Sequence, residues 1–382
     1  MKYLLSLDDY EDAARRYLPR PIFGYVSGGA ETNTSLNLNR TIWKDWLLKP
    51  SVLRDVSTGS LETSLLGETY DAPFGIAPMG GAAIAAYRGD TVLAKAAKAE
   101  NIPSVLSAAS LTPMEEVRSH SEVSWFQAYL PGNDEEISKI GKRVANAGFG
   151  TLVVTVDVPV VGNRENLIRT GFDVPLKPSL ALAWDGLKRP RWLTGCFFQT
   201  LIRYGMPHYE NMSDRIPLLS TTFEVQKSSG AQLTWQHMAR LRDTWKGKLI
   251  LKGVLAPEDV SEARKVGFDG VIASNHGGRQ LDFALHPMQV LPELISQAQG
   301  MPVMLDGGVR RGTDIIKALA LGAHFVFVGR PMLYAAGLGG ESGVRRAIGL
   351  LKSELQRDLA LLGRASVRHL DRSILVRSDQ PA

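Results

Sequence analysis

The chain has 382 residues, 44% of them hydrophobic, so it can bury a core as one large domain or as two modest ones. Its 44 basic and 39 acidic residues give a formal charge of +5 without the dense basic stripe of a nucleic-acid-binding protein. A single cysteine, Cys196, excludes an internal disulfide framework and suits a reducing compartment, so we expect a cytoplasmic protein. The sequence has no run of about 18 uncharged apolar residues, which excludes a spanning helix but not peripheral membrane contact.

Residues 1–60 precede the first expected strand, and we predict that they form helical segments closing one end of the fold. Eight short runs rich in β-forming residues follow, and most are apolar on both faces, as in strands buried between a core and a helical layer. They cover residues 72–78, 104–110, 124–130, 151–158, 249–254, 270–276, 302–308 and 325–331. Helix-like stretches lie between most of these runs, and several of them open with Asp or Glu and close at Gly.

The alternation of strands and helices predicts an α/β fold, a (β/α)₈ TIM barrel over residues 61–370. A doubly wound open sheet is the alternative, but no G-x-G-x-x-G motif follows the first strand. Residues 159–248 separate the fourth and fifth strands, which is far longer than a usual connection. We therefore expect one domain over residues 1–382, with an inserted segment at about 176–235.

Polar side chains follow one predicted strand after another. In a barrel of this type the working groups lie at the C-terminal ends of the strands. The polar residues at these ends are Ser107, Gln127, Tyr129, Thr155, Asp157, Lys252, Ser274, His276, Asp306, Arg310 and Arg330. A barrel held together only by packing needs no such set at one rim, so we predict the active site there, without a metal ion.

The sixth strand ends in S-N-H-G-G-R-Q-L-D, which puts His276 and Arg279 on one glycine-rich loop. A histidine can take a proton near neutral pH, and an arginine can hold a carboxylate by paired hydrogen bonds. The alternative is a surface His and Arg in a turn. The loops after strands seven and eight, D-G-G-V-R-R-G-T-D and V-G-R-P, combine glycine, arginine and a following helix, which is typical of a phosphate site.

Three further side chains have more than one interpretation. We consider three roles for Lys252: a Schiff-base lysine, a salt-bridge partner or a charge beside a cofactor. Asp157 is a helix-capping acid or the partner that orients the histidine, and its place at the rim favours the second role. Tyr25 precedes the barrel, where a buried tyrosine is more often part of the core than catalytic.

These segments together resemble the FMN-dependent L-2-hydroxy acid oxidising enzymes over essentially the whole chain. SNHGGRQLD is the most specific segment, and YVSGGA, WFQAYL, TVDVP, LKG and LDGGVRRGTD occur in the same order. The resemblance implies that His276 removes a proton from the substrate and that Asp157 steadies the imidazolium; carbanion and hydride mechanisms both need this base. It also implies that the substrate carboxylate and oxygens are held by Arg279, Arg164, Tyr25 and Tyr129.

The resemblance implies a bound FMN, with Lys252 near the flavin N1 and O2. The other implied cofactor contacts are Ala77, Pro78, Met79, Ser107, Gln127, Thr155, Ser274, Asp306, Gly307, Gly308, Arg310, Gly329 and Arg330. Met79 departs from the threonine usual in the family, which removes a hydroxyl near the flavin. Gly80 follows, and glycine there resembles the dehydrogenases of the family, whereas alanine is commoner in its oxidases. Three kinds of external electron acceptor stay open: a quinone, another carrier or oxygen.

The inserted segment, with RPRW at 189–192 and YGMPHYENM at 204–212, resembles that of mandelate dehydrogenase more than that of glycolate oxidase. In mandelate dehydrogenase this segment serves membrane association. Here it mixes apolar and basic side chains that could lie on the anionic inner face of a membrane: Trp184, Lys188, Arg189, Arg191, Trp192, Phe197, Phe198, Leu201 and Arg203. A lid or a subunit contact is the alternative, and the resemblance also suggests a homotetramer.

The first expectation for the substrate is an aromatic, mandelate-like acid of the (S) series. L-lactate and other aliphatic 2-hydroxy acids are the second, with dehydrogenase or oxidase activity. FMN-dependent isomerases share the barrel and the phosphate site but lack the carboxylate-binding pair of Arg164 and Arg279. A catalytically dead flavin scaffold is the non-enzyme alternative, and the retention of His276 and Asp157 argues against it.

Overall fold

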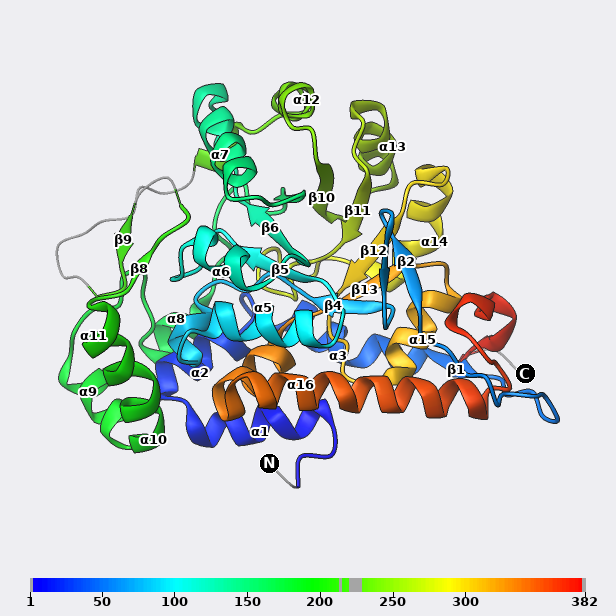
Figure 1. Ribbon diagram of the computed structural model, residues 1–382, viewed down its shortest axis with the longest axis horizontal. Helices are drawn as coiled ribbons and strands as arrows, with labels where there is room; N and C mark the ends of the chain where they lie inside the picture. The colour runs from blue at the N-terminus through cyan, green and yellow to red at the C-terminus, as the bar shows by residue number, and fades with distance from the viewer. Residues whose placement is uncertain (1–2, 213–214, 220–228, 380–382) are drawn as a thin grey trace.

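The computed structural model describes residues 3–212, 215–219 and 229–379. Eight parallel strands close into a barrel in the order β10-β11-β12-β13-β4-β5-β6-β7 (Figure 1). The strands are β4 (Phe74–Ile76), β5 (Ser104–Ser107), β6 (Ser124–Ala128), β7 (Thr151–Thr155), β10 (Lys248–Val254), β11 (Gly270–Ala273), β12 (Val303–Asp306) and β13 (Phe325–Val328). Seven of the eight predicted runs contain one of these strands, and the run 249–254 begins one residue after β10 does, so the prediction of a (β/α)₈ barrel is confirmed.

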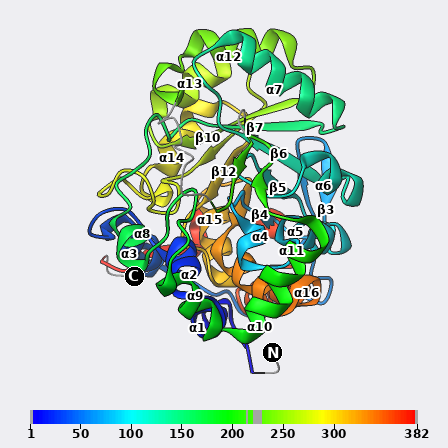
Figure 2. The same cartoon turned by 90° about the vertical axis from the view of Figure 1, so that its left-hand side faces the viewer.

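Helices follow the strands and surround the barrel (Figure 2). They are α5 (Gly89–Ala99), α6 (Met114–His120), α7 (Asp134–Asn146), α12 (Trp235–Thr244), α13 (Pro257–Val266), α14 (Pro287–Ala298), α15 (Gly312–Ala320) and α16 (Arg330–Leu361). Local sequence sets their ends. The Asn133 side chain accepts hydrogen bonds from the backbone N–H groups of Glu135 and Glu136 at the start of α7. Gly267 ends α13 with φ of 92°, a conformation that favours glycine.

Apolar side chains fill the barrel interior, and a hairpin closes the end at which the strands begin. The interior residues are Val105, Trp125, Val153, Ile250, Ile272, Met304, Phe325 and Phe327. The hairpin consists of β2 (Thr63–Leu65) and β3 (Glu68–Tyr70), and its Leu65 and Tyr70 join this cluster. The Tyr70 and Phe325 ring centroids lie 5.8 Å apart. The closure of this end thus comes from residues 63–70, just beyond the segment 1–60 that was expected to close one end of the fold.

The N-terminal helices connect both ends of the barrel. They are α1 (Leu7–Tyr17), α2 (Arg20–Ser27) and α3 (Thr34–Thr41), followed by a 3₁₀ turn (Ile42–Asp45) and β1 (Trp46–Leu48), which pairs antiparallel with β14 (Leu375–Arg377). Helix α1 packs along α16, whereas α2 and the loop after it reach the C-terminal ends of the barrel strands. There the Gly28 carbonyl accepts hydrogen bonds from Arg279 and Arg330.

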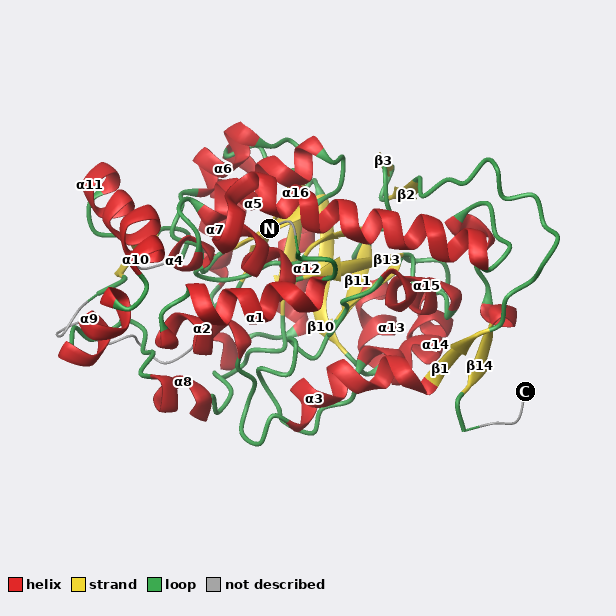
Figure 3. Ribbon diagram, turned by 90° about the horizontal axis from the view of Figure 1, so that it is seen from below, coloured by secondary structure: helices red, strands yellow, loops and turns green. Residues whose placement is uncertain are grey.

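The segment between β7 and β10 extends from the barrel at the end opposite to the β1–β14 pair (Figure 3). It contains α8 (Glu165–Thr170), α9 (Leu180–Leu187), α10 (Pro190–Trp192), a π-helical turn (Leu193–Phe198), α11 (Gln199–Tyr204), the strand pair β8 (His208–Tyr209) and β9 (Ile216–Pro217), and a 3₁₀ turn (Ser229–Gln232). Within the described part of the chain, no helix has the length and apolar character that crossing a bilayer requires.

Candidate active site

A cleft of about 2490 Å³ opens at the C-terminal ends of the barrel strands. Most of the predicted site residues line it: Tyr25, Ala77, Pro78, Met79, Tyr129, Thr155, Arg164, Lys252, His276, Arg279, Asp306, Gly307, Gly308, Arg310, Gly329 and Arg330. The remaining four, Ser107, Gln127, Asp157 and Ser274, lie behind this wall and contact lining residues or one another. The structure thus brings every predicted site residue to one place.

His276 and Asp157 form the central pair of the cleft. His276 Nδ1 lies 2.8 Å from Asp157 Oδ1, and the histidine backbone is left-handed, with φ of 56°. Burial lowers the pKa of His276 below its usual value, although Asp157 acts in the opposite direction. Burial acts to raise the pKa of Asp157, but the charge and hydrogen bond of His276 lower it overall. The resting histidine is therefore neutral near pH 7, and a proton on Nδ1 leaves the Nε2 lone pair free to act as a base.

Two half-buried arginines lie beside this pair. Arg164 donates from Nε to the Arg279 carbonyl at 3.0 Å and from Nη2 to Gln280 Oε1 at 2.7 Å. Arg279 donates from Nη1 to the Gly28 carbonyl at 2.7 Å. Burial, together with the neighbouring Arg164 and Arg330, lowers the pKa of Arg279 to about 9. Because like charges meet here in a poorly solvated place, an anionic ligand would stabilise the cluster.

Two tyrosines face the same space. The Tyr25 hydroxyl donates to the Gly80 carbonyl at 3.0 Å, and its ring stacks on Phe172 with centroids 4.4 Å apart. The centroid of the Tyr129 ring lies 6.5 Å from that of His276. Burial raises the pKa of Tyr129, with a smaller contribution from the charge of Asp157, so the hydroxyl stays protonated and can donate to a substrate oxygen.

Lys252 belongs to a buried polar triad. Its Nζ lies 2.7 Å from Asp306 Oδ2 and donates to Ser274 Oγ at 2.8 Å, while Ser274 Oγ donates to Asp306 Oδ1 at 2.5 Å. The contact with Asp306 shows that Lys252 has a salt-bridge partner, one of the three interpretations left open above. The ammonium group is held at the wall of the cleft, where it can stabilise negative charge on a bound molecule.

Several buried polar atoms at this wall have no hydrogen-bond partner among the described residues. They include Gln127 Nε2 and Thr155 Oγ1, from neighbouring strands β6 and β7. A buried donor or acceptor without a partner costs about 1–3 kcal/mol, so such atoms mark the place of a polar ligand. A flavin ring offers carbonyl oxygens and ring nitrogens of both hydrogen-bonding types, so these atoms fit the FMN implied by the sequence.

The loops after β12 and β13 fit the phosphate end of this cofactor. Gly308 has φ of 74°, and a Cβ atom there would lie 1.6 Å from the Asn39 carbonyl oxygen, so only glycine fits. Burial and the nearby Arg40 and Arg330 lower the pKa of Arg310 to about 10, and its buried Nε has no hydrogen-bond partner within the described ranges. Arg330 is fixed by the carbonyls of Val26, Gly28 and Gly277. A phosphate dianion would neutralise this group of arginines.

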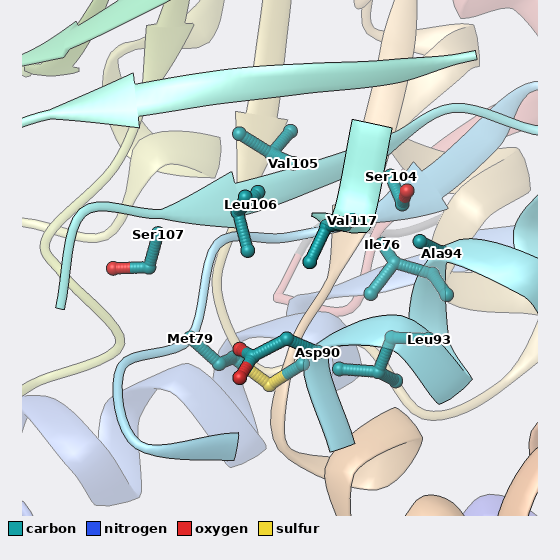
Figure 4. A pocket seen from close by; sticks show the side chains of 10 residues that line it. All are labelled: Ile76, Met79, Asp90, Leu93, Ala94, Ser104, Val105, Leu106, Ser107 and Val117. Atoms are coloured by element: carbon teal, nitrogen blue, oxygen red, sulfur yellow. The ribbon is translucent and has the colours of Figure 1, made fainter. Parts of the chain in front are cut away.

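A small cavity of about 10 Å³ lies behind Met79 and is shown in Figure 4. Its lining includes Ser107 and the carboxyl of Asp90, which faces the Met79 sulfur in that view. Asp90 Oδ2 accepts a hydrogen bond from Thr112 Oγ1 at 3.1 Å, and burial raises the pKa of Asp90 to about 7. The volume is that of about one water molecule. Sequence reasoning missed Asp90 because it looks like an ordinary acidic residue at the start of a helix.

Gln280 is a second residue that sequence reasoning missed. Its Oε1 accepts from Arg164, and its Nε2 donates to the carbonyls of Asp157 and Val160 at 3.2 and 3.0 Å. It therefore ties one arginine to the loop that carries the histidine's partner. The only signal was its position next to Arg279 in the SNHGGRQLD segment. The predicted barrel places β7 and β11 on either side of β10, but it does not show which side chains of their loops meet.

Comparisons with known proteins agree with this geometry. A family model described as FMN-dependent dehydrogenase matches residues 14–377. The chain belongs to the FMN-dependent dehydrogenase family. It is 37% identical over 366 residues to (S)-mandelate dehydrogenase of Pseudomonas putida, covering 94% of this chain and 91% of that protein. It is also 37% identical over 385 residues to L-lactate dehydrogenase of Caulobacter sp. (strain K31), covering 98% and 99%.

Among solved structures, a monotopic membrane (S)-mandelate dehydrogenase matches with a TM-score of 0.89 and 36% identity, covering 98% of this chain and 100% of that chain. A mandelate oxidase variant matches with a TM-score of 0.82 and 30% identity, covering 99% of each chain. This chain is therefore an oxidoreductase, and its cofactor is FMN. The resemblance read from the sequence, its enzyme class and its cofactor are confirmed.

Proposed function

We propose that this FMN enzyme oxidises an aromatic (S)-2-hydroxy acid to the 2-oxo acid and passes the electrons to an external acceptor. The observation that carries the proposal is the His276–Asp157 pair in the same cleft as Arg164 and Arg279. A base beside two half-buried arginines suits proton removal next to a carboxylate. The mandelate and lactate dehydrogenases that share 37% of their residues with this chain support the reaction class.

The chain's own residues then have distinct roles in the reaction. Arg279 and Arg164 bind the substrate carboxylate, and the hydroxyls of Tyr25 and Tyr129 orient the substrate oxygens. His276 Nε2 takes one proton from the substrate, and Asp157 stabilises the imidazolium that forms. FMN, when bound, would supply the oxidising power by taking up the two electrons and the second proton that leave the substrate.

The cofactor itself would be held by two sets of side chains. Lys252 would balance negative charge that develops on the flavin, and the unpartnered atoms of Gln127 and Thr155 would bind the ring. Ser107 and Ser274 position Gln127 and Lys252 through hydrogen bonds of 3.0 and 2.8 Å. The phosphate end would meet the residues of the β12 and β13 loops: Asp306, Gly307, Gly308, Arg310, Gly329 and Arg330. Ala77, Pro78 and Met79 supply the backbone at the end of β4.

Small and apolar side chains favour an aromatic substrate. Gly80 and Ala109 lie at the cleft next to Tyr25, and neither fills much space. The lining beyond them includes five apolar side chains, with Asp173, Lys177 and Arg215 between them: Leu167, Phe172, Val174, Met212 and Ile216. L-lactate is the second candidate because the lactate dehydrogenase relative is as similar as the mandelate enzyme. Gly80 favours an acceptor other than oxygen, as in the dehydrogenases of the family.

Anaerobic mixing of the purified yellow protein with (S)-mandelate and, separately, with L-lactate tests this proposal. We expect (S)-mandelate to bleach the flavin faster than L-lactate at equal concentration. Slow return of the colour in air would support a dehydrogenase, and rapid return would support an oxidase. A flavin that neither acid bleaches would contradict the proposed reaction and favour an isomerase or an inactive scaffold.

We propose that the segment from α9 to α11 holds the enzyme on the inner face of an anionic membrane. Leu180, Trp184 and Ile202 are 92%, 59% and 83% exposed, which is unusual for such large apolar side chains. Lys188 stands over the Trp184 ring at 5.1 Å, so basic and apolar groups share this surface. The similar structure of the monotopic membrane protein (S)-mandelate dehydrogenase supports the same placement.

Co-sedimentation of the protein with lipid vesicles tests this placement. We expect co-sedimentation with anionic but not with neutral vesicles, and equal recovery with both would argue for a lid or a subunit contact.

We propose that the 1–382 chain acts as one domain and assembles as a homotetramer. A single closed barrel with the N-terminal helices packed on it supports the first statement. Light scattering on the purified protein tests the second, and we expect a mass four times that of the 41.7 kDa chain. A monomeric mass would contradict the assembly without affecting the proposed reaction.

A further inference from the structure

Asn211 is a buried amide that joins the inserted segment to the barrel. It follows β8, in the segment that was expected to form a lid or a membrane contact. The residue is 5% exposed and is one of those that line the cleft. A polar side chain buried this deeply is stable only where hydrogen bonds compensate for the loss of water. The partners of the Asn211 side chain therefore show what it holds in place.

The Asn211 amide makes four hydrogen bonds, which is the full capacity of its two N–H groups and its carbonyl oxygen. Its Nδ2 donates to Ser110 Oγ at 2.6 Å and to the Thr112 carbonyl at 2.8 Å. Its Oδ1 accepts from the Met114 N–H at 2.9 Å and from Arg143 Nη2 at 3.3 Å. Three of the four partners belong to the loop after β5 and to the first residue of α6. The amide therefore fixes this loop to the inserted segment.

The same loop packs against the turn that follows β4. Ala109, directly before Ser110, accepts a hydrogen bond on its carbonyl from the Gly81 N–H at 2.8 Å. A Cβ atom on Gly80 would lie 3.0 Å from the Ala109 Cβ and 3.1 Å from the Tyr25 hydroxyl oxygen, so these residues pack closely. The Tyr25 hydroxyl donates to the Gly80 carbonyl at 3.0 Å. A shift of Ala109 would therefore move the group that orients the Tyr25 hydroxyl.

Removal of the Asn211 amide would leave buried polar groups of the loop without this partner. The Met114 N–H is one of them, and a buried donor without a partner is unfavourable, so we expect the loop to move until water reaches it. One bond across the contact would remain, from the Glu210 N–H to the Ser110 carbonyl at 3.1 Å. We therefore expect a displaced loop rather than an unfolded one.

We infer that Asn211 is a positioning residue for substrate binding, because it holds the loop after β5 where Ala109 and Gly80 set the place of the Tyr25 hydroxyl. This inference rests on the proposed function, in which that hydroxyl binds a substrate oxygen. Both polar atoms of the Asn211 side chain are fully bonded within the protein, so the residue acts through Tyr25 and not by a bond of its own to the substrate. The inserted segment thus has a role in substrate binding that needs no membrane.

A double-mutant cycle of Asn211→Ala and Tyr25→Phe tests the inference, with the acid that reduces the wild-type holoenzyme faster. We expect Asn211→Ala to raise KM about threefold to tenfold, as for the loss of one neutral hydrogen bond, and to leave the limiting rate of flavin reduction unchanged. In the Tyr25→Phe background the same substitution should leave KM unchanged, because the hydroxyl through which Asn211 acts is gone. An equal rise of KM in both backgrounds, or no rise in either, would overturn the inference.

Two further variants separate positioning from stability. Asn133→Ala is the matched control, because Asn133 is exposed and its side chain caps α7, so its loss should weaken the fold without changing KM. Ser110→Ala removes one partner of the Asn211 amide and keeps the other three bonds, so it serves if Asn211→Ala does not fold. We expect Ser110→Ala to raise KM about twofold to threefold, and again only where Tyr25 is present.

Equilibrium binding gives a second readout that needs no turnover. Benzoylformate, the 2-oxo acid of mandelate, is titrated into the oxidised holoenzyme, and the flavin absorbance reports Kd. The Kd should rise in Asn211→Ala by about the same factor as KM and stay at the wild-type value in Asn133→Ala. An unchanged Kd and KM in Asn211→Ala, with the wild type still reduced by its substrate, would overturn the inference alone. A wild type that neither (S)-mandelate nor L-lactate bleaches would instead overturn the proposed function.

Discussion

The two ends of the barrel differ in the polarity of the side chains that they bury. At the end where the strands begin, Leu65 and Tyr70 of the hairpin complete an apolar cluster with Phe325, and the aromatic rings contact one another. At the other end Arg279, Arg310 and Arg330 lie together, and the pKa of each is lowered by burial. The cluster at one end is apolar, whereas at the other end buried polar atoms such as Gln127 Nε2 and Thr155 Oγ1 have no hydrogen-bond partner among the described residues.

Stability and function therefore reside in different parts of the molecule. Buried like charges and unpartnered polar atoms destabilise a fold, so an active site that keeps them depends on stability supplied elsewhere. The apolar plug and the close-packed interior supply it here. Substitutions at the rim should therefore affect chemistry, and substitutions at the plug should affect folding.

The largest effect on chemistry is expected for His276→Ala. Removing the base should slow flavin reduction by about 10²- to 10⁴-fold, because a positioned general base contributes about that much. Bound FMN and the unfolding transition should persist, since the imidazole contributes little to packing. Stopped-flow reduction by (S)-mandelate measures the rate. Reduction at nearly the wild-type rate would show that another group takes the proton.

The largest effect on folding is expected for Phe325→Ala at the opposite end. Deleting a fully buried ring should lower the free energy of unfolding by about 3–5 kcal/mol. Chemical denaturation followed by fluorescence measures this change. Flavin reduction in the protein that remains folded should be close to wild type, and a large loss of the reduction rate would show that the two ends are coupled.

The pH dependence of kcat/KM reports the protonation state of His276 at the rim. Burial lowers the pKa of His276, so the base is already neutral at pH 7 and kcat/KM should fall only as the pH drops below 6.5. Asp157 raises this pKa, so Asp157→Asn should move the acid limb to lower pH while lowering the maximum rate. In the unfolded chain the histidine binds a proton near pH 6.5 that the folded site does not bind. The contribution of His276 to the free energy of unfolding therefore falls as the pH decreases through about 6.5.

A smaller effect is expected for Gly80→Ala. The added Cβ would lie 3.0 Å from the Ala109 Cβ and 3.1 Å from the Tyr25 hydroxyl, so Tyr25 must shift. We expect KM for (S)-mandelate to rise about tenfold, which corresponds to about 1.4 kcal/mol of lost binding. Gly349→Ala is the matched control, because its Cβ would meet nothing within 4 Å. An unchanged KM would show that Tyr25 does not contact the substrate.

The sequence predicted the parts of the molecule that local patterns determine. All eight strands were found because buried parallel strands are short apolar runs, and the rim residues follow because the ends of such strands converge. The β2–β3 plug was missed because three-residue strands carry little periodicity. Gln280 and Asp90 were missed because the residues that they contact come from distant segments, and only tertiary packing brings these together.

The decisive experiment measures flavin reduction and the free energy of unfolding on the same three holoproteins: wild type, His276→Ala and Phe325→Ala. We expect a crossed result, in which His276→Ala loses reduction but keeps its stability, and Phe325→Ala loses stability but keeps reduction. A parallel loss of both properties in either variant would contradict the division between the two ends of the barrel.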